Sequence, residues 1–191
     1  MYDLLLTNAV VITVDSAHTL YDRGFVAVKG DRIVALGPMD QLPDPLPEAE
    51  RVLNLSGHAV LPGLVDGHGH AGHCLIKTLG EHLDTGWDEM AEEIYYTCTD
   101  EEFWYAEGAL AAAERLKFGT TTGVSMVGST PRVDIIEPVG ASLAGGSSVG
   151  LRQLSGIGSA NGPWPKRARL FEEDGSCRSY SVTPQQAWAS T

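Results

Sequence analysis

Short apolar runs separated by turn-forming residues occupy the first sixty residues. One turn, Gly30-Asp31-Arg32, lies between two of these runs, and a proline-rich stretch at residues 38–47 reads as a loop. Short strands joined by tight turns predict part of a small β-sandwich over residues 1–60. The predicted strands are residues 2–14, 25–28, 33–36, 52–55 and 58–61.

The pattern changes at Pro62-Gly63, where a short apolar strand at Leu64-Val65 leads into Gly67-His68-Gly69-His70. The clearest helix is expected over residues 100–117, with Thr99 and Glu102 forming a capping box and Gly119 ending it. Its apolar residues recur at helical spacing and predict one buried face. That face consists of Phe103, Ala106, Leu110, Ala113 and Leu116.

Alternating strands and helices continue after this helix. A β-branched strand is expected at residues 120–127, a weaker helix at 133–144, a third strand at 149–154, and then a loop containing Lys166, Arg167 and Arg169. This order predicts an α/β fold with a parallel sheet. A complete (β/α)8 TIM barrel needs ~250 residues, so residues 61–191 would supply about three βα units, the N-terminal part of such a barrel.

A helix start near the C-terminus adds to this picture. Thr183, Pro184 and Gln186 match an N-cap, a proline at the first helical position and a capping-box glutamine. The helix has room for about two turns before Thr191, and isolated helices this short are marginal in water. We therefore expect another chain to complete the fold, or the polypeptide to have been cut.

Composition and charge exclude several classes of partner. The formal net charge is -12, from 13 basic and 25 acidic residues, which argues against a nucleic-acid partner. The apolar stretch near the N-terminus is too short to span a bilayer, so no membrane association is expected. Three widely spaced cysteines without a CxxC pair are typical of a reducing cytoplasm, where we expect the protein to be located.

The candidate chemistry lies in the two histidines of the Gly-His-Gly-His stretch. Side chains at i and i+2 of an extended segment point the same way, so His68 and His70 can reach one cation. Parallel barrels place their chemistry at the C-terminal ends of strands, and this pair follows the apolar strand start. An isolated HxH is weak evidence, but its position after a strand and before a βαβ pattern favours a metal site.

The stretch from Leu61 to His70 resembles the first-strand signature of the amidohydrolase superfamily. Residues 1–60 are similar to the N-terminal β-sandwich segment of that family. The region from Trp87 to Phe118-Gly119-Thr120-Thr121-Thr122 resembles the branch with cytosine-deaminase-like enzymes and s-triazine chlorohydrolases. The similarity covers roughly residues 1–156 and is most specific at 61–70 and 118–123.

The resemblance implies a metal-dependent hydrolase. One divalent metal, zinc or alternatively iron, would be held by His68, His70 and later ligands, and would hydrolyse a C–N or C–halide bond of a small heterocyclic or amide-type molecule through metal-bound hydroxide. After His82 the chain contains no histidine, so the remaining ligands and the general acid or base are expected on a second subunit. Two alternatives stay open: a truncated single-chain deaminase or amidohydrolase, and a non-catalytic scaffold subunit.

Three neighbouring residues are candidates for supporting roles. Asp66 either orients a ligand histidine as a hydrogen-bond acceptor or serves as a structural strand end. His73 would contact the substrate if a helix starts near it, and otherwise lies at the surface. Trp87 matches an aromatic residue that lines the substrate pocket in the resembling branch, although packing explains it equally well.

Overall fold

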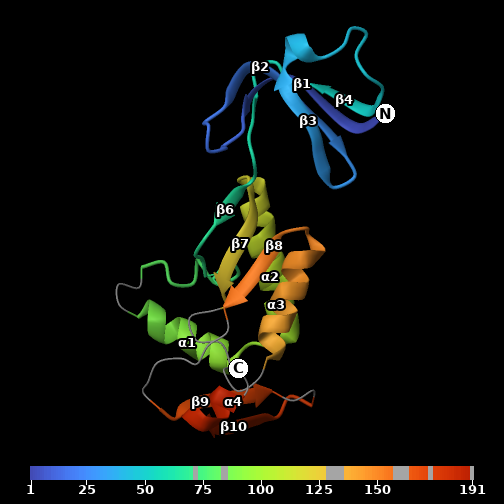
Figure 1. Cartoon of the computed structure of the whole chain (residues 1–191). Coiled ribbons are helices and arrows are strands. Elements are labelled where there is room, and N and C mark those ends of the chain that lie inside the picture. The colour runs from blue at the N-terminus through green and yellow to red at the C-terminus, as the bar shows by residue number, and fades with distance from the viewer. Residues whose placement is uncertain (71–72, 83–85, 128–135, 157–163, 172–173, 190–191) are drawn as a thin grey trace. The chain divides into compact units, whose positions relative to one another are not determined.

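The computed structural model describes residues 1–70, 73–82, 86–127, 136–156, 164–171 and 174–189. The chain divides into two compact units, Met1–Pro62 and Gly63–Thr191, and each is described by itself (Figure 1). The first unit contains β1 (Tyr2–Ile12), β2 (Leu20–Lys29), β3 (Arg32–Pro38), the 3₁₀ turn η1 (Met39–Gln41), β4 (Ala49–Asn54) and β5 (Ala59–Val60).

One sheet organises the first unit. Its order is β3-β2-β1-β4, and β5 also pairs with β1. Strand β1 runs antiparallel to β2 but parallel to β4 and β5, which lie along its two ends. Apolar side chains are buried in two clusters, one around Leu5, Phe25 and Ala27 and the other around Ala9, Val11 and Val26. The short strands expected from the sequence are confirmed, and the proline-rich stretch contains only η1.

Strands and helices alternate at the start of the second unit. Its elements are β6 (Leu64–Asp66), α1 (Trp87–Thr97), α2 (Glu101–Lys117), β7 (Thr120–Met126), α3 (Glu137–Ser148), β8 (Arg152–Gly156), β9 (Lys166–Phe171), β10 (Cys177–Val182) and α4 (Pro184–Ala189). Strands β6, β7 and β8 form a sheet in that order, and both pairings are parallel. The expected parallel α/β arrangement is therefore confirmed.

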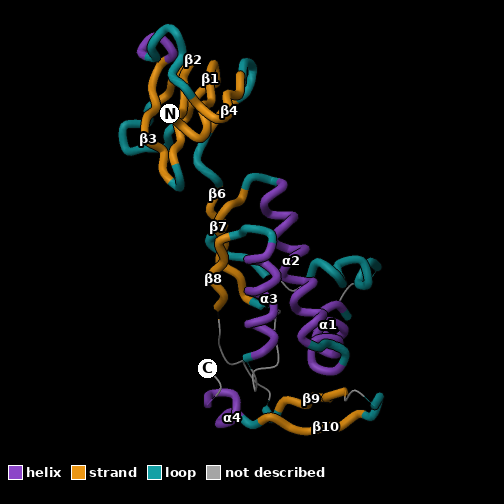
Figure 2. The backbone as a smooth tube through the Cα atoms, turned by 90° about the vertical axis from the view of Figure 1, so that its right-hand side faces the viewer, coloured by secondary structure: helices purple, strands orange, loops and turns teal. Residues whose placement is uncertain are grey.

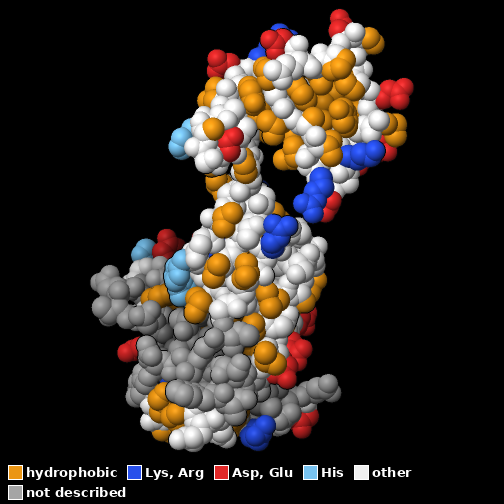
Figure 3. Space-filling view, in the orientation of Figure 1, with side chains coloured by type: hydrophobic (Ala, Val, Ile, Leu, Met, Phe, Trp, Pro, Cys, Tyr) orange, Lys and Arg blue, Asp and Glu red, His pale blue; other side chains and the backbone are white. Residues whose placement is uncertain are grey.

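Among the described residues, helices cover one face of this sheet and none covers the other. Figures 1 and 2 show α2 and α3 packed side by side behind the three strands. On the opposite face the side chains of Val65 and Leu154 are 71% and 56% exposed. Hydrophobic side chains are accordingly visible over the sheet in Figure 3. This face carries exposed apolar side chains beside Thr122 and Arg152, the register neighbours of Val65, and exposed apolar residues are unusual on a parallel sheet.

The contact between α2 and α3 depends on glycine. A Cβ atom on Gly108 would lie 2.2 Å from the carbonyl oxygen of Ser142, and one on Gly145 would lie 2.1 Å from that of Tyr105. The two backbones therefore approach more closely than larger residues allow. This close approach sets which face of α2 is buried.

The face predicted for α2 was wrong by one position. Ala106 of the predicted face is exposed, and Phe103 and Leu110 are only partly buried. The buried residues are Trp104, Glu107, Gly108, Ala111 and Ala112. The prediction was based on hydrophobicity alone. The close contact with α3 requires small residues on the buried face, and Glu107 is buried there beside Trp104.

The predicted cap of α2 was also wrong by one residue. Asp100 is the N-cap, and its carboxylate accepts a hydrogen bond from the Phe103 N–H at 2.8 Å. Thr99 instead donates to the Tyr95 carbonyl and accepts from the Trp104 indole N–H. At the other end Gly119 has a φ of +85°, so the expected glycine stop is confirmed.

The C-terminal part of the unit differs most from expectation. Helix α3 begins at Glu137, and residues 133–135 of the predicted helix lie outside the described part of the chain. Strands β9 and β10 form an antiparallel hairpin where a loop was expected, so Lys166, Arg167 and Arg169 lie on a strand. The capping box before α4 is confirmed, because the Thr183 N–H donates to Gln186 Oε1 at 2.8 Å. None of the described helices is long and apolar enough to span a membrane.

Replacing Gly108 with alanine should separate α2 from α3. The new Cβ would collide with backbone atoms of α3, so we expect a loss of about 1–3 kcal/mol in the free energy of unfolding, measured by chemical denaturation. Gly140→Ala is the matched control, since that glycine is an exposed residue of α3 with open space around it. This control should gain up to ~1 kcal/mol from helix propensity. Equal effects of the two substitutions would contradict the close contact.

Candidate metal centre and substrate cleft

Backbone pairing places the two histidines at the C-terminal edge of the parallel sheet. Beyond β6 the Gly69 carbonyl accepts a hydrogen bond from the Met126 N–H at 2.8 Å. His70 then pairs in parallel register with Met126, the last residue of β7. The histidine segment thus continues the β6 ladder to the edge where parallel barrels carry their chemistry.

The two imidazole rings lie close together and are open to solvent. Their centroids are 5.1 Å apart with an interplanar angle of 74°, and both residues are exposed. Two imidazoles bound to a tetrahedral zinc ion at about 2.1 Å place their centroids about 5 Å apart, so the pair fits one cation. Within the described ranges, no group of three or more His, Cys, Asp or Glu residues is arranged to hold a metal. The geometry of the two rings is therefore compatible with one shared cation.

Asp66 contacts the backbone of the histidine segment and a buried cation. Its Oδ1 accepts from the His68 backbone N–H at 3.2 Å, and its Oδ2 lies 3.0 Å from Arg115 Nη2. The Arg115 side chain is only 15% exposed. The carboxylate therefore acts on the main chain of His68, whereas the sequence suggested a hydrogen bond to an imidazole ring. The sequence did not point to Arg115, because a basic residue in the last turn of a helix is common and carries no motif.

The two predicted pocket residues, His73 and Trp87, lie in one aromatic cluster. Their ring centroids are 5.7 Å apart, and the His73 ring is 6.1 Å from that of His70. His73 Nδ1 shares a hydrogen bond with the Tyr95 hydroxyl. Burial, and then the nearby charge of Glu107, raise the pKa of the Tyr95 phenol, so the hydroxyl stays protonated at neutral pH. Both His73 and Trp87 are partly buried.

An open cleft of about 520 Å³ borders this cluster. Trp87 forms one of its walls. A Cβ atom on Gly80 would lie 2.2 Å from the Trp87 ring, so the absent side chain lets the indole lie against the backbone. The cleft is lined by Lys77, Thr78, Gly80, Glu81 and Trp87. It thus combines an aromatic wall with one cationic and one anionic side chain.

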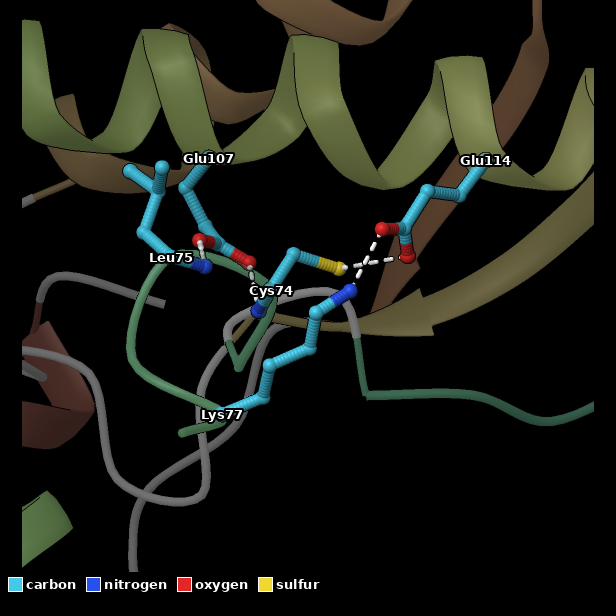
Figure 4. Close-up of polar contacts among 5 residues, drawn as sticks. All are labelled: Cys74, Leu75, Lys77, Glu107 and Glu114. Carbon is cyan, nitrogen blue, oxygen red and sulfur yellow. Dashed lines mark hydrogen bonds and ion pairs between the residues drawn. The ribbon is translucent and has the colours of Figure 1, made fainter. Parts of the chain in front are cut away.

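Two glutamates of α2 hold the segment that follows the histidines (Figure 4). The fully buried carboxylate of Glu107 accepts from the backbone N–H groups of Cys74 and Leu75, both at 2.6 Å. Glu114 pairs with Lys77 at 2.5 Å and lies 3.6 Å from the Cys74 Sγ. One signal in the sequence could have pointed to Glu107, because this carboxylate lies three residues after Trp104 on the same helical face.

These contacts change the chemistry of the groups involved. Burial, reinforced by the charges of Glu107 and Glu114, raises the pKa of the Cys74 thiol to about 12. The hydrogen bond between Lys77 and Glu114 raises the pKa of the lysine and lowers that of the glutamate. Lys77 is solvent-exposed, lies in a turn segment and forms this ion pair.

Known proteins similar to this chain include several deaminases. No family model matches the chain. It is 35% identical over 126 residues to a 5-methylthioadenosine/S-adenosylhomocysteine deaminase of Syntrophobacter fumaroxidans, covering 65% of this chain and 28% of that protein. The enzyme of the same name from Nitratidesulfovibrio vulgaris is 30% identical over 156 residues, covering 81% and 33%. The chain thus spans about a third of the length of these relatives.

Solved structures show the same fold over a similar portion. A triazine hydrolase variant has a TM-score of 0.60 at 22% identity, covering 81% of this chain and 35% of that one. A zinc-bound adenosine deaminase of Xanthomonas campestris has a TM-score of 0.57 at 24% identity, covering 80% and 33%. An Escherichia coli guanine deaminase also reaches 0.57, at 20% identity, covering 80% and 35%.

The fold is that of the first part of a (β/α)8 barrel, as the sequence predicted. The chain is similar over most of its length to the N-terminal portion of enzymes of the amidohydrolase superfamily.

Cys74 should resist alkylation. With its pKa raised to about 12, the thiol carries little thiolate at pH 8, so we expect iodoacetamide to modify it at least about tenfold more slowly than the exposed Cys177. Peptide mapping by mass spectrometry during a time course measures both rates in one sample. Comparable rates at the two cysteines would contradict the contacts of Cys74 with α2.

Proposed function

We propose that this chain supplies the first two metal ligands, His68 and His70, of a hydrolase that removes an amino group from a small heterocyclic molecule. The observation that carries the proposal is the pair of imidazoles 5.1 Å apart at the C-terminal edge of the first barrel strand. The family relationship and the deaminases among its relatives support C–N bond hydrolysis.

A divalent cation bound here would supply a water molecule activated for attack at neutral pH. Imidazole nitrogens suit zinc, and iron is the alternative. The residues of this chain would bind the cation through His68 and His70. Asp66 would hold the His68 backbone, and His73 and Trp87 would form one side of the substrate site. In the reaction, water adds oxygen to the ring carbon, the C–N bond breaks and ammonia leaves, with its proton delivered by a general acid outside the described residues.

The substrate class follows from the relatives and from the cleft beside Trp87. The relatives are named for 5-methylthioadenosine and S-adenosylhomocysteine, which share an amino-substituted purine. An indole on one wall of an open cleft provides a surface on which a flat heterocycle stacks. We propose an amino-substituted purine as the substrate class, in preference to the halide or amide substrates that the sequence also allowed.

We further propose that a second polypeptide supplies the later strands and ligands. Val65 and Leu154 are exposed on the face of the β6-β7-β8 sheet that no described helix covers, and among the described residues no group of three or more potential ligands is arranged to hold a metal. The relatives are about three times as long as the matched region. A further polypeptide chain that covers this face would bury its valine and leucine side chains and complete the metal site.

Replacing the histidines tests the metal site. His68→Ala and His70→Ala should each remove bound zinc and reduce deaminase turnover by at least about 100-fold, because each substitution deletes one of the ligands that hold the cation. Zinc content by elemental analysis and ammonia release from 5-methylthioadenosine measure the two effects. His58→Ala, an exposed histidine of the other unit, is the control and should change neither. Unchanged turnover in both ligand variants would support the scaffold alternative.

Native mass spectrometry of the protein purified from its source tests the second polypeptide. We expect one assembly that contains this chain, a larger partner and one zinc ion. Recovery of the 191 residues only as the beginning of a longer single chain would contradict the two-subunit proposal. It would leave the proposed chemistry in place.

A further inference from the structure

Leu64-Val65-Asp66 and the histidines after them have few apolar contacts to hold them. Strand β6 is only three residues long, and Leu64 and Val65 are mostly exposed. Among the described residues, β6 pairs only with β7. The position of the histidines therefore depends on polar contacts at the strand end.

Arg115 of α2 contacts this strand end from the face of the sheet that the helices cover. Its Nη2 lies 3.0 Å from Asp66 Oδ2, and the other oxygen of that carboxylate accepts from the His68 N–H. The Asp66 carboxylate thus links the guanidinium to the backbone of His68, a proposed metal ligand. A charge-assisted contact of this kind is stronger than a neutral hydrogen bond.

Two glycines make room for this guanidinium. A Cβ atom on Gly69, which lies between the two histidines, would sit 2.0 Å from Arg115 Nη2. One on Gly123 of β7 would sit 2.9 Å from Arg115 Nη1. The backbone of both strands therefore closes directly over the side chain. The buried Nη1 has no hydrogen-bond partner within the described residues, so the position of the group is set mainly by Asp66 and by packing.

We propose that Arg115 is a positioning residue for the metal site, acting through Asp66 on the backbone of His68 and through steric contact on Gly69. This rests on the proposed metal-binding role of the histidines. Helix α2 would then set the spacing of the two imidazoles before a cation arrives. Contacts that orient metal ligands typically change metal affinity 10–100-fold when removed.

The first test measures zinc affinity of the assembled protein by chelator competition. Arg115→Met should weaken zinc binding at least about tenfold while the protein stays folded, and Arg115→Lys should recover part of the loss because it keeps a cation near Asp66. Lys117→Met is the matched control, since Lys117 is an exposed residue of the same helix, and it should leave the affinity unchanged. Zinc affinity within twofold of the parent in a folded Arg115→Met protein would overturn the proposal.

A second variant keeps the proposal testable if Arg115→Met does not fold. Gly69→Ala should displace the guanidinium and weaken zinc binding in the parent protein. It should cause little further loss in a background carrying Arg115→Lys, whose shorter head group leaves space for the new methyl. An equal loss in both backgrounds would show that Gly69 acts independently of Arg115, and would overturn the steric part of the proposal.

The outcomes separate this inference from the proposed function. If His68→Ala and His70→Ala retain zinc, the proposed metal site is wrong, and the positioning role of Arg115 at that site is wrong with it. If those two variants lose zinc but Arg115→Met does not, the metal site stands and the role of Arg115 is wrong. Hydrogen exchange at the peptide spanning residues 64–70 provides a readout without metal, and it should be faster in Arg115→Met.

Discussion

The parallel ladder between the β6 segment and β7 is the constraint on which the candidate site depends. Beyond the three residues of β6, the bond from the Met126 N–H to the Gly69 carbonyl carries the pairing to the histidines. A parallel pair requires a crossover connection, and α1 and α2 provide it. The position of α2 beneath the strands therefore fixes both the register of the sheet and the groups that approach the histidines from its helical side. Its glycine-mediated contact with α3 in turn fixes α2.

Helix α2 uses its buried face for charge as well as for packing. A buried charge is costly unless it is paired or hydrogen-bonded. Glu107 meets this requirement with two backbone N–H groups, and Arg115 meets it with the Asp66 carboxylate. In both cases the partner belongs to the polypeptide just before or just after the histidines. The helix therefore holds the segment at both ends by contacts that a purely apolar face does not offer.

Much of the fold followed from the sequence because periodicity and glycine placement are local signals. The strands before and after the histidines, the helix ending at Gly119 and the capping box at Thr183 were all predicted. The buried face of α2 was not, because Gly108 packs there only in the presence of a neighbouring helix that the sequence does not locate. The same holds for Arg115 and Glu107. Their roles come from partners 49 and 33 residues away along the chain, Asp66 and Cys74. The hairpin of β9 and β10 was missed because its serine- and arginine-rich strands lack an apolar alternation.

Polar residues of the parallel sheet face the helices, whereas several of its apolar residues face away from them. Asp66, Gly123 and Gln153 are lateral neighbours, and they face the helices, where Arg115 and Gly146 contact them. Val65 lies on the opposite face, as do Val124 and Leu154, which pair with each other. In a closed barrel that opposite face is the interior, filled by branched apolar residues in layers. The exposed valine and leucine side chains are thus placed where the remaining strands of a barrel pack, and the histidines stand at the rim of the same unfilled space. Under the proposed function, strands that cover these valine and leucine side chains would also lie beside the histidines.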